Sequence, residues 1–204
     1  MKKLIVIVAA LLVAVSAHAQ LGVVAGNTSS KTDLKAAKDD VKNISLYHVG
    51  LTYKMDFGLL AIQPSLIYNM KGSKFSLLTP DTLYDNFEYK TGYVELPVQV
   101  QAGINLGLAR LYGFVEPFLG YAVTNQVSFA QGEPKKTWDN IKSKMEYGIG
   151  VGAGVELIQH VQVSVKYFWN MGQMYGKDFK ISDFTTTMAE QKCTGIAASV
   201  ALLF

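Results

Sequence analysis

The sequence predicts an all-β fold: a closed, eight-stranded, antiparallel up-and-down transmembrane β-barrel preceded by a cleaved signal peptide. Three observations support this prediction. Apolar and polar residues alternate with period two in segments of about ten residues, and the connections alternate between short and long. The mature chain also contains no run of about 18 apolar residues that could form a spanning helix. Because half of the residues are hydrophobic and only 17% are charged, the chain is either an unusually apolar soluble β protein or a membrane barrel.

The composition of the two faces favours the membrane barrel. In the segment 144–157, glycines and charged residues occupy one face and mainly aliphatic residues occupy the other. The segments 93–102 and 160–170 divide in a similar way, although Phe168 interrupts the polar face. Small residues beside a few long polar ones suit the interior of a narrow barrel, and an aliphatic face with aromatic ends suits a lipid-facing band.

We expect strands at about 21–29, 44–56, 58–70, 92–105, 110–125, 144–157, 160–170 and 192–204. Short turns lie at 56–58, 105–109 and 158–159, and long loops rich in lysine and aspartate lie at 30–43, 71–91, 126–143 and 171–191. Short periplasmic turns with long outer loops are typical of outer-membrane barrels, and eight strands place both termini in the periplasm. The last strand ends on Phe204, as in barrels that are inserted by the barrel assembly machinery.

Aromatic residues are predicted to form girdles at the ends of the outward face. The expected girdle residues are Tyr47, Tyr68, Tyr93, Tyr121, Tyr147, Tyr167, Trp169 and Phe204.

The inward face is predicted to hold a structural network of polar side chains, because buried charges persist by pairing with one another. Its expected members are His48, Lys54, Glu95, Gln99, Glu116, Glu146, Glu156 and Lys166, and the alternation also turns Lys144 and His160 inward. The lone Cys193 cannot form an internal disulfide and is expected to be a small interior filler. Eight strands leave room only for side chains, so no open pore is expected.

The N-terminus predicts export. Lys2 and Lys3 precede an apolar stretch, and Ala17-His18-Ala19 forms a cleavage site before Gln20. We therefore expect a signal peptide at 1–19, a barrel domain at 20–204 and a location in the outer membrane of a Gram-negative bacterium. Loss of the two lysines lowers the formal net charge from +3 to +1, so no nucleic-acid partner is expected.

Catalysis is not expected, and neither is a metal or cofactor. The mature chain contains no Gly-x-Ser-x-Gly elbow, metal-ligand pair or phosphate loop. One alternative is a lipid A-modifying enzyme that uses His48, with Ser45 or Ser164 as conceivable partners. Mass spectrometry of lipid A from a His48→Ala strain tests it, because an unchanged profile removes the idea.

The long loops are the other candidate for function, since loops on rigid scaffolds often carry binding sites. Their apolar residues include Phe75, Phe87, Trp138, Phe179 and Phe184. These residues can grip a protein partner or extend the strands above the membrane and pack together. Other expected partners are outer-membrane lipid and lipopolysaccharide.

Four short motifs resemble the PorT-like outer-membrane β-barrel family of Bacteroidota. They are the segments 22–27 (Gly-Val-Val-Ala-Gly-Asn), 47–51 (Tyr-His-Val-Gly-Leu), 62–66 (Ile-Gln-Pro-Ser-Leu) and 93–98 (Tyr-Val-Glu-Leu-Pro-Val). The resemblance implies an outer-membrane barrel, and for some relatives an accessory role in a secretion system. It implies no catalytic residue. The predicted function is therefore structural support or partner binding through the outer loops, with a secretion accessory barrel as the alternative.

Overall fold

The chain folds into a closed barrel of eight antiparallel strands, which confirms the predicted fold class. The computed structural model describes residues 19–33, 41–79, 82–129, 145–171, 178–181, 184–187 and 192–204. The strands around the barrel are β1 (Ala19–Asp33), β2 (Val41–Phe57), β3 (Leu60–Thr79), β4 (Thr82–Asn105), β5 (Ala109–Phe129), β6 (Met145–Leu157), β7 (Val161–Asn170) and β10 (Lys192–Leu203). A separate hairpin pairs β8 (Asp178–Ile181) with β9 (Phe184–Thr187).

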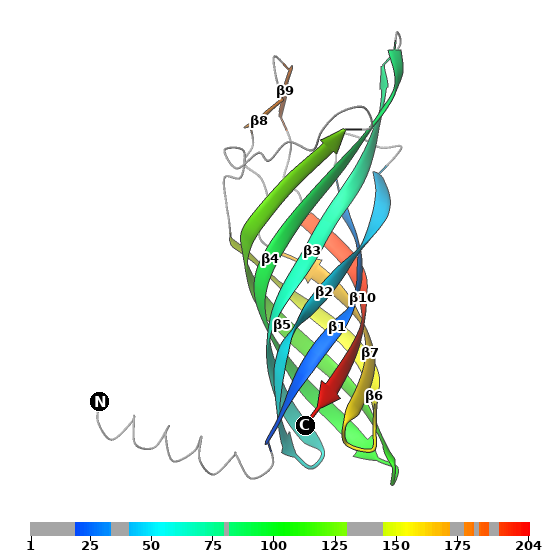
Figure 1. Cartoon of the computed structure of the whole chain (residues 1–204), viewed down its shortest axis with the longest axis vertical. Coiled ribbons are helices and arrows are strands. Elements are labelled where there is room, and N and C mark those ends of the chain that lie inside the picture. Colours follow the sequence, from blue (N-terminus) through cyan, green and yellow to red (C-terminus); the bar gives the residue numbers. More distant parts are fainter. Residues whose placement is uncertain are drawn as a thin grey trace, which may run out of the picture.

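The barrel closes where the last strand pairs with the first. β10 runs antiparallel to β1 from Gly22↔Leu203 to Asp33↔Lys192, and β7 covers its other edge. The start of β1 and the C-terminus lie at the end of the barrel that carries the three short turns (Figure 1). We call this the turn end and the opposite one the loop end. Among the described residues, no helix is long and apolar enough to cross a membrane.

Four strands are clearly longer than the sequence predicted. β1 continues to Asp33, into the segment 30–43 that was expected to be a loop. Residues 71–91 were expected to form a loop, but β3 and β4 continue in antiparallel register to Thr79↔Thr82. β5 accompanies β4 as far as Phe87↔Phe129. We call the paired residues 72–79 and 82–90 the ribbon, which rises beyond the rest of the barrel in Figure 1. Pro80-Asp81 is a turn signal between two β-rich segments and could have predicted this hairpin.

Two β-bulges mark the level at which the barrel gives way to the ribbon. One lies between Asn43 and His48 of β2, and the other lies where Gly92 and Tyr93 of β4 pair with β5. A bulge adds a residue to one strand, bends it and increases its twist, which is why bulges occur at the rims of barrels. These bulges allow the long strands to leave the barrel wall without losing their pairing.

The outward face of the barrel is apolar from one end to the other. On β2, the outward residues run from Tyr47 through Val49 and Leu51 to Phe57. Ten residue steps of about 3.3 Å, tilted by about 40°, cover about 25 Å along the barrel axis, which matches the apolar band of outer-membrane barrels. The outward face therefore has the composition and the height of a lipid-facing surface.

Glycines on the inward face of β6 make room for large side chains of neighbouring strands. A Cβ atom on Gly152 would lie 2.4 Å from the Val165 carbonyl oxygen and 2.5 Å from the Phe114 ring. A Cβ atom on Gly150, two residues earlier on the same face, would find its nearest neighbour at 3.5 Å. The four glycines of this strand therefore differ in how strictly a side chain is excluded.

This difference predicts unequal effects of two matched substitutions. Gly152→Ala forces the backbone of β7 or the Phe114 ring to move, and we expect it to lower the free energy of unfolding by about 1–3 kcal/mol. Gly150→Ala serves as the control, with a change of about 0.5 kcal/mol or less. The measurement is the temperature at which the folded, faster-migrating band on an SDS gel disappears. Equal temperatures for both variants would contradict the predicted packing.

Candidate functional site

The interior of the barrel holds a network of charged and polar side chains that extends along its axis. Of the described side chains, four basic residues (Lys54, Lys71, Arg110 and Lys166) and five acidic residues (Asp56, Glu95, Glu116, Glu146 and Glu156) point inward. The charges nearly balance, and each acidic residue lies within 4.0 Å of a basic group. We call this set and its hydrogen-bond partners the lumen network.

At the turn end, Lys54 is the centre of the network. Its Nζ atom lies 2.8 Å from both carboxylate oxygens of Glu156 and 2.8 Å from Oδ2 of Asp56. Gln162 donates a hydrogen bond of 2.8 Å to Oε2 of the same Glu156. Three strands are thereby joined across the lumen, because Lys54 comes from β2, Glu156 from β6 and Gln162 from β7.

A chain of amides continues from this cluster across the barrel. Arg110 donates to Oε1 of Gln101 at 3.0 Å, and Gln101 donates to Oε1 of Gln63 at 2.7 Å. Gln63 in turn donates to Thr52 Oγ1 at 2.9 Å. The Nε atom of Arg110 is buried and has no hydrogen-bond partner. The amide chain links β5, β4, β3 and β2 in one layer.

Near mid-height, Lys166 forms an ion pair with Glu116, which also accepts a hydrogen bond of 2.8 Å from Gln99. A cavity of about 30 Å³ lies beside these residues, and Ser164 and Ser199 also line it. A volume of this size holds one or two water molecules, since each needs at least about 10–15 Å³. The cavity is therefore suited to hydration of the network and is too small for a substrate.

His48 belongs to a hydrogen-bond chain with a single consistent direction. Its Nε2 atom lies 2.9 Å from Ser199 Oγ, and its Nδ1 atom lies 2.9 Å from Thr28 Oγ1. Thr28 donates to Asn69 Oδ1, and Asn69 donates through Nδ2 to Glu95 at 3.1 Å. Because Thr28 uses its only proton toward Asn69, it must accept from Nδ1, and a neutral His48 must accept from Ser199. The chain therefore fixes the tautomer of this histidine.

Near the loop end, Lys71 is enclosed by two carboxylates and three aromatic rings. Its Nζ atom lies 2.7 Å from Glu95 Oε1 and 2.7 Å from Glu146 Oε1. The ring centroids of Phe118, Phe168 and Tyr93 lie 4.5, 5.0 and 5.5 Å from the same atom. The ammonium group is thus neutralised by ion pairs and contacts the negative faces of the rings. Tyr93, Phe118, Ala122, Phe168 and Cys193 form a buried apolar cluster around it.

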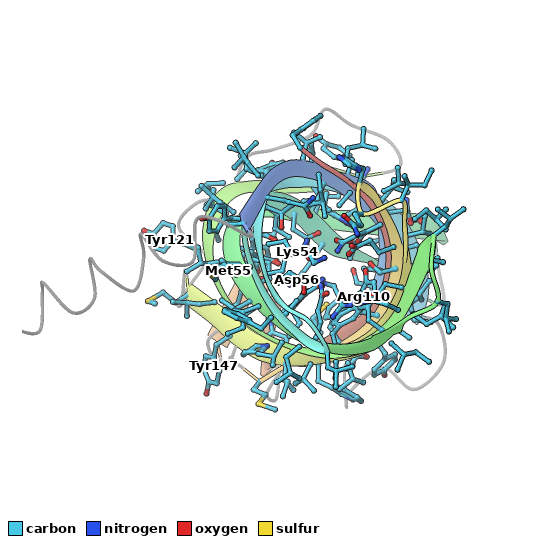
Figure 2. All side chains as sticks on the ribbon, turned by 90° about the horizontal axis from the view of Figure 1, so that it is seen from below. Lys54, Met55, Asp56, Arg110, Tyr121 and Tyr147 are labelled. Atoms are coloured by element: carbon cyan, nitrogen blue, oxygen red, sulfur yellow. The ribbon has the colours of Figure 1, made fainter. Side chains whose placement is uncertain are left out.

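The turn end differs from the loop end because it is hollow. A cavity of about 920 Å³ opens there, and Lys54, Asp56, Arg110 and Glu156 contribute to its wall. Figure 2 shows Lys54, Asp56 and Arg110 pointing into the barrel from this end. We call this cavity the vestibule. The described lumen is therefore wide at the turn end and filled with side chains toward the loop end.

The structure places all eight predicted network residues on the inward face. His48, Lys54, Glu95, Glu116, Glu146 and Glu156 are buried, and Gln99 and Lys166 are half-buried beside the small cavity. His160 was also expected inside, which is wrong: it is exposed in the β6–β7 turn, where its Nδ1 atom lies 2.6 Å from the Ile158 carbonyl oxygen. Lys144 lies outside the described residues. Cys193 is fully buried in the lumen.

One predicted girdle residue has the opposite orientation. Tyr93 was expected to face lipid, which is wrong, because it is only 3% exposed and lies inside next to Lys71. It shares its face with Glu95 by strict alternation. Tyr68 faces outward but is half-buried against Tyr47, and its hydroxyl group forms a hydrogen bond with Thr124 Oγ1. The other expected members are exposed on the outer surface, namely Tyr47, Tyr121, Tyr147, Tyr167, Trp169 and Phe204. Figure 2 shows Tyr121 and Tyr147 pointing away from the barrel.

Two central members of the lumen network were missed by the sequence analysis. Lys71 was assigned to a loop, although it continues the inward alternation of Gln63, Ile67 and Asn69. Arg110 stands at the start of β5, where the expected strand also began. It is an even number of residues from Glu116, so the alternation predicts that both side chains point inward. Extending the alternation of the expected strand 58–70 by one residue would have found Lys71, and Arg110 already lay within the expected strand 110–125.

The structure does not assemble the histidine–serine pairs considered for lipid A chemistry. Ser45 lies on the outer face, where it donates to Asn27, whereas His48 points inward. Ser164 lines the same small cavity as His48, but the contacts of His48 are with Ser199 and Thr28. Among the described residues, no group of three or more histidine, cysteine or acidic side chains is arranged to hold a metal ion. The side chains of Phe75, Phe87, Trp138, Phe179 and Phe184 lie outside the described residues.

Comparisons with known proteins give one family match and several structural likenesses. A family model described as outer membrane protein beta-barrel domain matches residues 14–176. No curated protein matches the chain. Neisserial surface protein A is 13% identical, with 90% of this chain and 97% of that chain covered and a TM-score of 0.47. Ail of Yersinia pestis is 13% identical (92% and 99% covered, TM-score 0.42), and OprG of Pseudomonas aeruginosa is 11% identical (91% and 94% covered, TM-score 0.43).

The geometry around Lys71 predicts a strong dependence of folding on this residue. Lys71→Met leaves Glu95 and Glu146 buried without a counter-ion, and we expect the free energy of unfolding to fall by about 3–5 kcal/mol. Adding Glu95→Gln and Glu146→Gln to the same variant removes the uncompensated charges and should restore more than half of the loss. Urea titration of the reconstituted barrel, followed by tryptophan fluorescence, measures both effects. A single variant as stable as the wild type would contradict the proposed role of the ion pairs.

Proposed function

The chain belongs to the outer membrane protein beta-barrel domain family, and from that premise we propose that it is a non-catalytic barrel that presents a binding platform on the cell surface. The ribbon carries this proposal. Its strands remain paired for many residues beyond the outer aromatic girdle, from Gly72↔Lys90 to Thr79↔Thr82. A paired ribbon is stiffer than a loop, so its backbone offers a partner a defined surface.

The lumen supports a non-catalytic role. The side chains that resemble catalytic groups, such as His48 and the inward glutamates, are already bonded to one another. The cavity beside His48 is about 30 Å³, which is far below the roughly 300–1,000 Å³ of ordinary ligand pockets. Satisfied polar groups in a closed interior stabilise a barrel and leave its function to the exposed surfaces.

The sequence also leads to a proposal for how the protein is exported and inserted into the membrane. We propose that residues 1–19 are removed on export, which N-terminal sequencing of the purified protein checks, and that the barrel assembly machinery recognises the last strand. Ile196, Val200, Leu202 and Phe204 point outward on β10, and the backbone N–H of Phe204 donates to Leu21 across the closing seam. Lipopolysaccharide is the proposed lipid neighbour of the outer girdle.

Removing the ribbon tests the proposed platform. In the variant, residues 74–88 are deleted and Ser73 is joined to Tyr89 through Asn-Gly, because these two residues already face each other and suit a two-residue hairpin turn. We expect the variant to keep its gel-shift behaviour and to lose the partner that is cross-linked to the wild type on intact cells. The matched control deletes the β8–β9 hairpin, residues 178–187, and should keep the partner. A partner that persists without the ribbon contradicts the proposal.

A secretion accessory role, as in PorT-like proteins of Bacteroidota, is the second candidate. The vestibule favours it, because this charged cavity opens at the end of the barrel that the family topology assigns to the periplasm. We expect a strain that lacks the protein to retain secreted proteins in its periplasm, measured by mass spectrometry of periplasm and medium. Identical protein profiles in the mutant and the parent strain would remove this candidate.

A further inference from the structure

The three turns at the turn end expose large apolar side chains. Leu108 is 79% exposed, Leu59 is 68% exposed and Ile158 is 67% exposed. Each residue belongs to a different turn, and Leu106 and Leu60 add further exposed apolar surface. Turns that face water normally carry polar residues, and exposed apolar patches on soluble surfaces are usually covered by something.

The apolar residues form a complete ring around the mouth of the vestibule. Between the three turns, Leu21 of β1 and Leu202 of β10 point outward, and the terminal Phe204 is 72% exposed. Every strand of the barrel therefore ends at this level on an exposed apolar residue or in an apolar turn. We call the ring, formed by Leu21, Phe57, Leu59, Leu60, Leu106, Leu108, Leu157, Ile158, Leu202 and Phe204, the apolar collar.

The backbone of the β6–β7 turn gives a second, independent reason to regard the exposed apolar side chains of the turns as functional. Ile158 has a φ of 53°, in the left-handed region that glycine, asparagine and aspartate adopt most readily. The other two turns use Gly58 and Gly107 for their positive φ values. A β-branched residue in this conformation is strained, and strain that a sequence retains points to a function of the side chain.

Formal charges at this end are directed away from the collar. Lys54, Arg110 and Glu156 point into the vestibule, and Asp56 is tied to Lys54 and to the backbone N–H of Gly58. The exposed polar residues in the three turns, Asn105, Gln159 and His160, are amide or imidazole side chains. An apolar belt with neutral polar groups beside it matches the boundary between acyl chains and headgroups.

We infer that the apolar collar is seated in the inner leaflet of the outer membrane, with phospholipid as its partner. Two features favour lipid over a docked protein. The collar is continuous with the apolar outer face of the barrel, and it surrounds the whole circumference, whereas a protein partner would cover one side. The vestibule then opens among the headgroups of the inner leaflet.

Spin labels on the three turns test this inference. Leu59→Cys, Leu108→Cys and Ile158→Cys are labelled with a nitroxide in protein that is reconstituted alone into phospholipid vesicles. Val115→Cys, which pairs with Val100 and Val151 in the middle of the outward face, is the lipid reference, and the free nitroxide label in the buffer is the aqueous reference. The wild type reports the background, because its single cysteine, Cys193, is fully buried. All four labelled positions are exposed, so the labels displace no interior contact.

The measurement is the ratio of collisions with oxygen, which partitions into lipid, to collisions with a water-soluble nickel chelate. We expect all three turn labels to give a ratio several-fold above that of the free label and close to that of Val115→Cys. Ratios equal to the aqueous reference at the three turns would overturn the inference and place the turns in water. A lipid-like ratio at only one or two turns would also overturn it, because a one-sided surface fits a docked protein.

Discussion

The narrowness of the lumen is the constraint on which the rest of the structure depends. Beyond the vestibule, the eight-stranded barrel encloses too little space for bulk water, so each charge that the strand alternation turns inward there must find its partner among other side chains. The fold meets this requirement by placing lysine between carboxylates. Lys54 lies between Asp56 and Glu156, and Lys71 lies between Glu95 and Glu146. Three of these four contacts join different strands, namely β2 to β6, β3 to β4 and β3 to β6, so the ion pairs also connect strands across the lumen.

The glycines of β6 follow from the same constraint. A lumen that holds lysines, glutamates and the rings of Phe114, Phe118 and Phe168 has no room for eight walls of full-sized side chains. β6 therefore presents a row of glycines, and the rings of Phe114 and Phe118 occupy the space that their missing Cβ atoms leave. The conformational freedom of glycine matters less here than its small volume, since these residues lie in ordinary extended strand.

Alternation alone predicts the barrel and most of its interior, because a period of two assigns each residue to one face irrespective of distant contacts. It predicted the inward position of Glu95, Glu116 and Glu146 before any contact was known. It did not predict the ends of strands, where polarity resembles that of a loop, and so Lys71 was missed. Tyr93 was assigned outward because aromatic residues at strand ends usually face lipid. In the structure, the Tyr93 ring instead lies beside the buried ammonium group of Lys71. Alternation could not predict this contact, because it depends on residues that are distant in the sequence.

The two ends of the barrel depart from the central band in opposite ways. Toward the loop end, β3 and β4 continue beyond the bulges as the paired ribbon, and the lumen below it is filled by Lys71 and the rings around it. Toward the turn end, the strands stop within a few residues of one another and the lumen widens into the vestibule. There the charged side chains point into the vestibule, and the apolar collar surrounds its mouth. A protein that transported a solute would need continuity between these ends, and the paired charges interrupt it. Among the described residues, the surfaces that remain available to other molecules are therefore the ribbon at one end and the mouth of the vestibule at the other, and the filled lumen separates them.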